Sequence, residues 1–293
     1  VDRIVAGDFV HFDKLTDEET HNARFYVIEQ ILRENPKLYS PEQIAIALLI
    51  LGDLKNIMIV LKGDLALIFN NQTSGGPLTV IFNSIDVSLW TRCAFYDSNP
   101  DEDFNKCVEL ATYGDDSVKG VSPRVNFSHT QIQAFYATRG VGYTMSVKGQ
   151  ESVPYSNIQD IDFLKRKFFP YQHPTLGLII LDPLDPKSLY KMLSWTSSRD
   201  GHEQIRLLQI LENLQRESLR QPEHVRAELL NLSSLLENKY VELFGSEKFQ
   251  VLDRDSVIQL VLEGSDTSEV NYLQELEADN DNVAVEKSYF INL

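Results

Sequence analysis

The sequence predicts an α+β fold in which an antiparallel sheet backed by helices is followed by a helical region. Three observations support this prediction. The N-terminal stretch VDRIVAGDF is typical of a short strand that ends at a carboxylate, Asp8. Residues 108–113 and 117–121 are two strand-like segments that flank the turn Gly114-Asp115-Asp116, as in a hairpin. From Pro186 to about Phe244 the pattern is almost wholly helical.

Capping and turn signals predict the elements of the first half of the chain in order. A capping box at 16–19 opens a helix that runs to about Arg33. A serine cap with proline at the next position begins a second helix over about 40–61. Residues 65–69 are strand-like, and the loop 70–77, with two glycines, leads into a long apolar helix that ends near Phe95.

The second half begins with another capped helix, from Ser128 to Gly140. A strand pair is expected around 158–168, and further helices are expected to start near Pro186 and Pro222. The tail beyond residue 245 contains one plausible helix, 256–262, and an acidic run that we expect to be mobile.

Length and composition indicate a globular protein of one or two domains, with 293 residues of which 43% are apolar. Two cysteines make a disulfide framework or a zinc site an unfavourable interpretation, and they fit a reducing compartment. Charged residues interrupt the apolar stretch 44–69, so no transmembrane helix is predicted. The chain shows no secretory signal and no initiator Met, which leads us to expect a piece of something longer.

The net charge of −16 is unevenly distributed. Residues 246–293 hold 11 acidic and 3 basic residues, which is half of the excess. A complete nucleic-acid-binding protein usually has a basic footprint, because contacts to phosphates dominate affinity. This chain has none, unless the part that grips nucleic acid lies upstream of Val1.

Three carboxylates lie beside predicted strands and are candidates for a common site. Asp8 ends the first strand, and Asp115 and Asp116 lie in the turn of the hairpin. If they converge, they can hold two divalent cations, the arrangement used for in-line phosphoryl transfer. Hard oxygen ligands suit Mg²⁺, so aspartate is the expected residue type and histidine is not.

Each short motif also has a simpler interpretation. Asp8 and Asp13 resemble ordinary solvated surface charge, and a Gly-Asp turn is favoured by the backbone alone. Asn83 could cap a local turn, and Thr79 could pack within a helix. Lys148 could be an exposed turn residue. In the same way Lys165 and Arg166 could lie on a solvated strand face. The order and spacing of the motifs, and no single one of them, favour a functional interpretation.

In this order the motifs resemble those of the RNA-dependent RNA polymerases of picorna-like positive-strand RNA viruses. The segments that resemble family motifs A to E are, in order, Asp8–Asp13, Ser74–Asn83, Tyr113–Asp116, Lys148 and Phe163–Arg166. The resemblance covers roughly residues 1–245. It implies a palm, at 1–170 with part of the fingers between 33 and 72, and a helical thumb at 171–245 before the acidic tail 246–293. Most of the fingers, which in this family precede motif A, are then absent.

The resemblance implies template-directed RNA synthesis with two Mg²⁺ ions, which Mn²⁺ can replace. Asp8 and Asp115 are expected to bind the metals directly, with Asp116 more peripheral and the carbonyl of Phe9 as a further ligand. Lys148 is expected to act as the general acid that protonates the leaving pyrophosphate.

The nucleotide and RNA sites follow from the same resemblance. Asp13 and Asn83 are assigned to the ribose, because a carboxylate can accept a hydrogen bond from the 2′-OH and an amide can donate one. Ser74, Gly75 and Thr79 are expected to assist, in a loop and helix whose glycines allow the backbone to change shape. Lys165 and Arg166 are expected to bind the primer backbone.

The expected partners are RNA template and primer, nucleoside triphosphates, a small protein primer and other viral replication proteins. The expected location is the host cytoplasm, at membrane-associated replication complexes. Two competing functions are a reverse transcriptase, which shares the two-metal chemistry, and an inactive palm–thumb fragment that acts only as an interaction module. Without the fingers, the fragment alone is expected to be inactive.

Overall fold

A computed structural model describes residues 3–69, 76, 78–194, 203–245, 253–255 and 258–259. The chain divides into two compact units, Val1–Leu164 and Lys165–Leu293, and each has its own buried apolar clusters. The sequence predicted a boundary after residue 170. The division observed after Leu164 assigns the whole hairpin that follows to the second unit.

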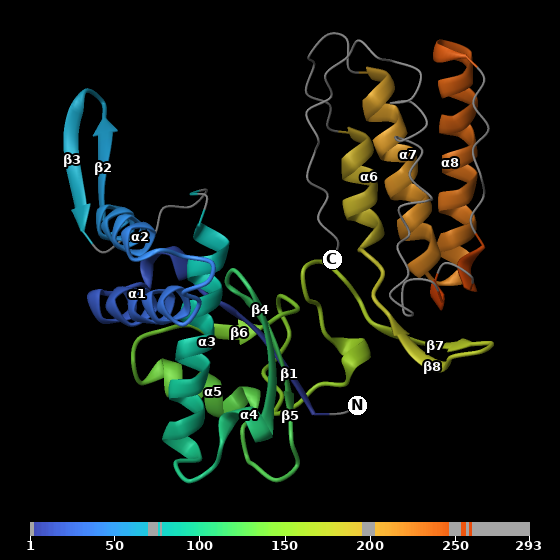
Figure 1. The fold of residues 1–293 in the computed structure, drawn as a ribbon. Helices are drawn as coiled ribbons and strands as arrows, with labels where there is room; N and C mark the ends of the chain where they lie inside the picture. Colours follow the sequence, from blue (N-terminus) through green and yellow to red (C-terminus); the bar gives the residue numbers. More distant parts are fainter. Residues whose placement is uncertain are drawn as a thin grey trace. The chain divides into compact units, whose positions relative to one another are not determined.

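Four strands form an antiparallel sheet in the first unit (Figure 1). They are β1 (Ile4–Phe9), β4 (Val108–Tyr113), β5 (Asp116–Val121) and β6 (Tyr143–Met145), in the spatial order β4-β5-β1-β6. The predicted hairpin is confirmed, because β4 pairs with β5 from Val108 opposite Val121 to Tyr113 opposite Asp116. β1 lies in the interior of the sheet between β5 and β6, and it ends at Phe9, one residue after the predicted carboxylate Asp8.

Helices back this sheet, as predicted (Figure 1). They are α3 (Thr79–Ser98), α4 (Phe104–Cys107) and α5 (His129–Ala137). Val5 and Phe9 from β1 are buried with Val87 and Phe95 from α3 and with Ile132 from α5, so strand and helices share one core. The predicted cap at Ser128 is present at the start of α5, where Ser128 and Gln131 form a capping box.

Two helices, α1 (Glu18–Arg33) and α2 (Pro41–Leu54), follow β1 and the short 3₁₀ helix η1 (Phe12–Lys14). The serine cap predicted for α2 is confirmed: Ser40 is the N-cap, and together with Gln43 it forms a capping box. For α1 the predicted cap is wrong: Asp17 is the N-cap, and its carboxylate accepts a hydrogen bond from the amide of Thr20. Carboxylates are at least as good as threonine at this position, and they also interact favourably with the helix dipole.

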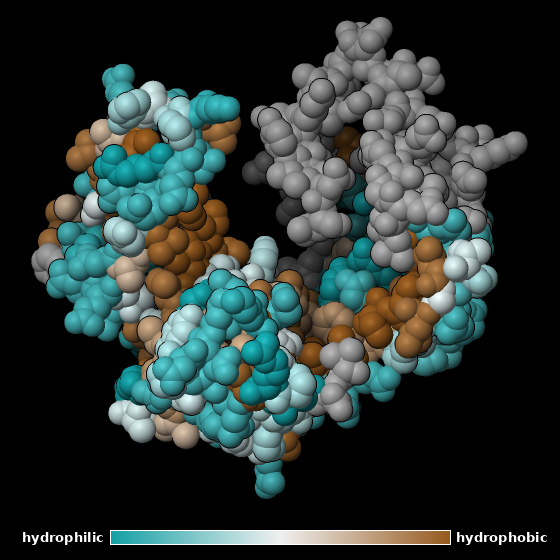
Figure 2. All heavy atoms as spheres, turned by 60° about the horizontal axis from the view of Figure 1, so that its bottom comes forward, coloured by the Kyte–Doolittle hydropathy of each residue, from teal (hydrophilic) through white to brown (hydrophobic). Residues whose placement is uncertain are grey.

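The predicted length of α2 is also wrong, because the chain leaves the helix after Leu54 and forms a β-hairpin. Its strands are β2 (Asn56–Leu61) and β3 (Asp64–Phe69), joined at Lys62 and Gly63, which both have positive φ. Branched apolar residues in 57–60 favour a strand over a helix. Apolar side chains of this region lie on the surface: Leu49, Met58 and Val60 are 72%, 68% and 73% exposed, and Figure 2 shows apolar surface on the first unit.

The second unit begins with a hairpin and continues with three helices. These are β7 (Phe169–His173), β8 (Gly177–Leu181), α6 (Pro186–Ser194), α7 (Glu203–Arg220) and α8 (Glu223–Phe244). The helices share apolar clusters that include Leu189, Leu214 and Leu229. The predicted helix starts near Pro186 and Pro222 are confirmed.

The predicted strand pair around 158–168 is wrong. Residues 158–160 form a 3₁₀ helix, η2 (Ile158–Asp160), and the strands start only at Phe169. Leu164 and Lys165 both have positive φ, which turns the chain tightly and interrupts any strand there. The predicted helix 256–262 lies almost wholly outside the described residues. None of the helices that the described residues form is long and apolar enough to cross a lipid bilayer.

Candidate active site

The sheet register brings Asp8 and Asp116 side by side. In the antiparallel pair of β1 and β5, Gly7 lies opposite Ser117. Extending this register by one residue places Asp8 opposite Asp116, where facing Cβ atoms are typically about 4.5–5.5 Å apart. Side chains alternate along a strand, so both carboxylates lie on the sheet face opposite to the core residue Phe9.

Asp115 lies next to this pair, in the turn between β4 and β5. Gly114 has φ of 64°, a conformation that glycine adopts without strain, and Asp115 is exposed at the turn. Among the described residues, no three His, Cys, Asp or Glu side chains form a group that could hold a metal ion. The sheet register accounts for the closeness of Asp8 and Asp116 only, and the convergence of all three carboxylates on a pair of metal ions stays a prediction.

The oxygen ligands that these residues offer are of the type that a hard divalent cation prefers. Asp8 and Asp116 supply carboxylate oxygens from neighbouring strands, and Asp115 adds a third carboxylate one residue away in the chain. Asp8 and Asp116 are only partly exposed. Carboxylates held together in this way repel one another, so they favour a bound cation.

A side chain of α3 fixes the turn that carries Asp115. The backbone amide of Gly114 donates a hydrogen bond of 2.8 Å to Oγ of Ser84. The hydroxyl of Ser84 in turn donates to the carbonyl of Val80, one helical turn earlier, at 2.7 Å. The hydroxyl thus acts as donor and acceptor, and it ties the hairpin turn to α3.

Phe9 anchors the end of β1 directly after Asp8. Its ring is 5% exposed and makes tilted or edge contacts with the rings of Phe12, Trp90, Tyr136 and Tyr143, at centroid distances between 4.9 and 5.6 Å. Such aromatic clusters hold the backbone of a strand end in place. The expected role of the Phe9 carbonyl as a metal ligand stays a prediction.

A buried lysine lies on the core side of the same strands. Lys119 is 1% exposed, and its ammonium donates hydrogen bonds to Oγ of Ser117 at 2.8 Å and to the hydroxyl of Tyr143 at 3.1 Å. No ion pair joins Lys119 to a carboxylate among the residues that the structure describes. Burial lowers the pKa of Lys119 to about 7. Burial also raises the pKa of Tyr143, and the charge of Asp8 adds to that rise.

Gly7 allows Tyr143 to approach the strand of Asp8. A Cβ atom at position 7 would lie 2.2 Å from Cζ and 2.3 Å from the hydroxyl oxygen of Tyr143. No side chain fits in that space, so only glycine permits this contact. The ring of Tyr143 therefore lies directly against the backbone next to Asp8.

One face of α3 carries the residues expected to recognise the nucleotide. Thr79 and Asn83 are four positions apart and lie on the same side of the helix. Asn83 is half-buried, and its Oδ1 has no hydrogen-bond partner among the described residues. Asp13 lies in η1, while Ser74 and Gly75 lie outside the described residues.

Lys148 is exposed in the turn that follows β6, the neighbour of β1 in the sheet. This strand pairing places the turn beyond the end of a strand adjacent to the one that carries Asp8. Its assignment as general acid stays a prediction.

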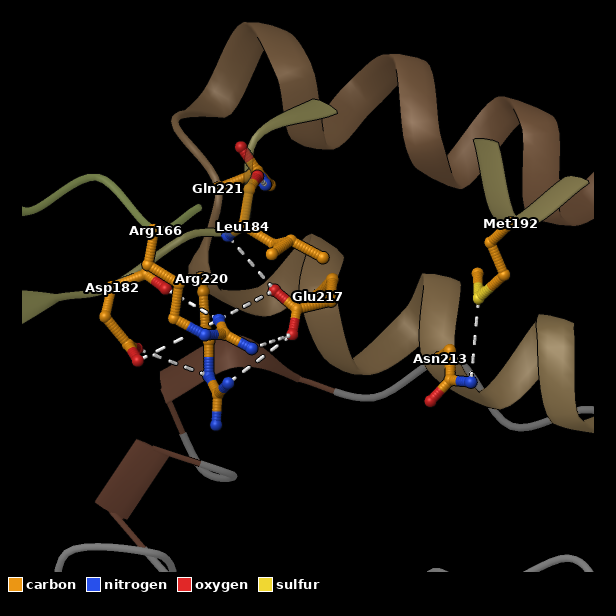
Figure 3. Close-up of polar contacts among 8 residues, drawn as sticks. All are labelled: Arg166, Asp182, Leu184, Met192, Asn213, Glu217, Arg220 and Gln221. Carbon is orange, nitrogen blue, oxygen red and sulfur yellow. Dashed lines mark hydrogen bonds and ion pairs between the residues drawn. The ribbon is translucent and has the colours of Figure 1, made fainter. Parts of the chain in front are cut away.

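The two cations of the expected RNA contact, Lys165 and Arg166, differ in their surroundings. Lys165 is exposed in the tight turn. Figure 3 shows the guanidinium of Arg166 turned toward Glu217: it forms two hydrogen bonds of 2.8 and 3.2 Å to that carboxylate, and another of 2.8 Å to the carbonyl of Asp182. Burial lowers the pKa of Arg166, but the contacts with Glu217 outweigh it and raise that pKa overall. Arg166 is thus engaged inside the second unit, and its contact with RNA stays a prediction.

Comparison with known proteins decides the family. The family model described as viral RNA-dependent RNA polymerase matches residues 1–244 of the chain. The chain belongs to the viral RNA-dependent RNA polymerases. The resemblance inferred from the motifs is confirmed.

Curated relatives of this polymerase chain are polyproteins of picorna-like viruses. The RNA1 polyprotein of Cherry rasp leaf virus is 28% identical over 215 residues, which cover 64% of the chain and 9% of the polyprotein. The replicase polyprotein of Drosophila C virus is 28% identical over 207 residues, 66% of the chain and 12% of the polyprotein. The chain therefore spans about a tenth of the length of these relatives.

A solved structure supports the fold of the polymerase chain. The Sicinivirus 3Dpol RNA-dependent RNA polymerase matches with a TM-score of 0.59 and 18% sequence identity, over 89% of the chain and 51% of that protein. At this identity the match concerns the fold alone. The α+β fold class predicted from the sequence is confirmed.

Sequence reasoning missed four residues that shape the candidate site: Gly7, Ser84, Lys119 and Tyr143. Two of them had a weak signal. A glycine within a strand often marks a close approach of another group, and a lysine at an inward position of a strand is unusual. Ser84 and Tyr143 had none, because their partners lie far away in the sequence.

Proposed function

We propose that the chain contributes the catalytic centre of template-directed RNA synthesis, the transfer of a nucleotide from a nucleoside triphosphate to the 3′-OH of RNA. The observation that supports this most is the register of β1 and β5, in which Gly7 lies opposite Ser117, so that the next residues, Asp8 and Asp116, face each other beside Asp115 in the adjoining turn. Membership of the polymerase family gives this carboxylate group its chemical context.

Asp8, Asp115 and Asp116 would hold two Mg²⁺ ions, with the carbonyl of Phe9 as a further ligand, and Mn²⁺ could replace them. When bound, such ions lower the pKa of the attacking hydroxyl and stabilise the charge of the leaving pyrophosphate. The chain's contribution is to orient the ligands. Ser84 fixes the turn of Asp115, and the aromatic cluster around Phe9 fixes the end of the strand of Asp8.

The incoming nucleotide would be recognised through its sugar. Asp13 accepts a hydrogen bond from the 2′-OH, and the amide of Asn83 donates one, with Ser74, Gly75 and Thr79 assisting. The half-buried side chain of Asn83 on α3 supports a hydroxyl contact, because its carbonyl oxygen has no partner among the described residues and can accept a hydrogen bond, while its amide nitrogen is the donor of the pair. This pair would favour ribonucleotides, and it therefore distinguishes the proposal from a reverse transcriptase.

Proton transfer and RNA binding would use the exposed cations. Lys148 donates a proton to the pyrophosphate as it leaves. Lys165 and Arg166 bind the primer backbone, with Lys165 as the more accessible of the two. RNA template and primer, nucleoside triphosphates, a protein primer and other viral replication proteins are the proposed partners, and membrane-associated complexes in the host cytoplasm are the proposed location.

Primer extension with purified protein tests this function, using the chain itself and a longer form of the polymerase that contains it. Asp8→Asn and Asp115→Asn should each lower incorporation about a hundredfold or more, because each removes a charged ligand at the reacting centre. Asp101→Asn is the matched control, since Asp101 is an exposed loop carboxylate away from the sheet edge. Equal activity of Asp115→Asn and the unaltered longer form would end the catalytic assignment.

A further inference from the structure

An ion pair is buried between two helices of the first unit. Arg24 on α1 and Asp86 on α3 both have side chains that are 0% exposed, and Nη1 of Arg24 lies 2.8 Å from Oδ2 of Asp86. The second guanidinium nitrogen contacts Nδ1 of His21. The guanidinium carbon lies 4.4 Å from the centroid of the Phe82 ring. Arg24 is thus held by a charge, a ring nitrogen and an aromatic face.

Joining two helices through this pair costs free energy, because both charged groups lose their contact with water. Burial raises the pKa of Asp86 to about 7 in spite of the opposing charge of Arg24, which shows how strongly desolvation acts here. Replacing a buried ion pair by apolar residues of similar volume is often neutral or stabilising, so such a pair is weak evidence for a role in stability. Apolar contact between the same helices already exists, because the rings of Phe25 and Phe82 lie 6.0 Å apart.

Asp86 lies on the face of α3 that carries the residues expected to contact the ribose. Thr79, Asn83 and Asp86 follow one another at spacings of four and three residues, so they share one face of the helix. Asp86 is one turn from Asn83, whose Oδ1 is buried and has no hydrogen-bond partner among the described residues. Any rotation of α3 that broke the contact with Arg24 would also turn Asn83.

The position of Arg24 connects the pair to the other predicted sugar contact. Arg24 lies in the second turn of α1, which begins at Glu18, shortly after the 3₁₀ helix that contains Asp13. The ion pair therefore joins the helix that follows Asp13 to the helix that carries Asn83. Charge-assisted hydrogen bonds are more directional than apolar contacts and so restrain sliding and rotation better.

We infer that Arg24 and Asp86 are a positioning pair for sugar selection: their contact holds α3 against α1 so that Asn83 and Asp13 can engage the same ribose hydroxyl. Neither residue touches the nucleotide. The inference rests on the proposed function, since it assigns the pair to the ribose site of that reaction.

The test compares incorporation of ribonucleotides and 2′-deoxyribonucleotides by the longer polymerase form. The double variant Arg24→Met/Asp86→Leu replaces the pair by apolar side chains. It retains apolar packing between α1 and α3 but removes the directional hydrogen bond that joins them. We expect the ratio of kcat/KM for the ribo over the deoxy substrate to fall about ten- to a hundredfold, the effect of a small misplacement of a recognition group. Deoxynucleotide incorporation should be nearly unchanged.

Val125→Ala is the matched control, because Val125 is buried in the core of the same unit and lies in neither α1 nor α3. It should lower stability and leave the sugar ratio unchanged. Arg24→Lys provides a second variant that keeps a cation beside Asp86 and so folds even if the double variant does not. It should lower the ratio by a smaller factor, because lysine lacks the planar fork of arginine.

The possible results distinguish a failure of the proposed polymerase function from a failure of the role inferred for Arg24 and Asp86. If the unaltered polymerase incorporates no nucleotide, the proposed function fails and the ion pair is not at issue. If it prefers ribonucleotides and folded variants of the pair keep the same preference, Arg24 and Asp86 are only structural and the inference is overturned. A lowered ratio in both pair variants but not in Val125→Ala supports the inference.

Discussion

Gly7 shows how a single residue determines the position of a candidate catalytic group. It precedes Asp8 in β1, and the ring of Tyr143 occupies the space that a side chain at position 7 would need. The hydroxyl of that ring is held by Lys119, which also binds Ser117 on the neighbouring strand. The backbone at Asp8 is thus supported from the core side by a tyrosine and a lysine.

We expect Gly7→Ala to destabilise the first unit by about 1–3 kcal/mol, because a Cβ atom 2.2 Å from the tyrosine ring forces strand or ring to move. Polymerase activity should fall as well, since Asp8 moves with the strand. Urea unfolding and primer extension measure the two effects. Gly120→Ala on β5 is the matched control: its added Cβ would meet nothing closer than 3.8 Å. Equal behaviour of the two variants would contradict the proposed tight contact.

Lys119 makes stability depend on pH in a defined direction. Its pKa is lowered from 10.5 to about 7 by burial. Between these values the unfolded chain binds a proton that the folded chain has released, so the free energy of unfolding rises with pH across this window. Below about pH 7 both states are protonated, and the full cost of burying the charge is present. His129, which stacks on Tyr143, has its pKa lowered by burial, so it titrates below this window.

We therefore expect Lys119→Met to be more stable than the unaltered protein near pH 7, by an amount on the order of a few kcal/mol, with the difference shrinking toward pH 10. Chemical unfolding at pH 7, 8 and 9.5 measures it. Lys106→Met, at an exposed lysine whose side chain is 74% accessible, should show no such pH-dependent difference. Parallel curves for Lys119→Met and the unaltered protein would show that Lys119 is not neutralised in the folded state.

At the scale of elements, the contact between α3 and the β4–β5 turn joins two predicted motifs that are 30 residues apart. We expect Ser84→Ala to lower stability by about 1 kcal/mol and to lower activity, because the amide of Gly114 loses its acceptor and the turn of Asp115 becomes less fixed. Hydrogen exchange of that amide should become faster. Ser98→Ala is the control, since Ser98 lies in the same helix and bonds only with nearby groups at its C-terminal end. Unchanged exchange at Gly114 would contradict the tether.

Elements whose signals are local could be predicted from the sequence. The hairpin around Asp115 and the caps at Ser40 and Ser128 are correct because each depends on residues within a few positions. The end of α2 was missed, because the helix-like apolar pattern continues into β2 and only a hairpin partner distinguishes the two structures. The strand expected near Leu164 fails for a related reason, since positive φ values there are not evident from the residue types.

The candidate site, too, could be predicted from the sequence only in part. The types and order of Asp8, Asp115 and Asp116 are visible in the sequence, but their relative placement depends on strand register. The contacts that support them, such as those of Lys119 and Ser84, join residues 24 to 30 positions apart and leave no local pattern. The buried pair of Arg24 and Asp86, separated by 62 positions, is invisible for the same reason.

At the scale of the whole molecule, charge is the property that opposes the proposed function. The chain has 27 basic and 43 acidic residues, and RNA affinity depends on neutralising phosphates. We therefore expect the chain alone to bind RNA weakly, with a Kd above about 1 μM at physiological salt, and to extend no primer. The stretch after Gln259 contributes strongly, since it holds 8 acidic residues and 1 basic residue.

Removing residues 260–293 should raise RNA affinity several-fold at low salt and less at high salt, because the repulsion that is removed is screened within about 10 Å at 0.1 M. Cutting after Gln259 keeps Arg254, which donates to the carbonyls of Leu219 and Gln221, and Asp255, which accepts from Tyr171. Fluorescence anisotropy with labelled RNA at two salt concentrations measures the change. A full-length variant with the eight acids changed to amides separates charge from length. If truncation raises affinity and this variant does not, the tail acts by occupying space and the electrostatic explanation is wrong.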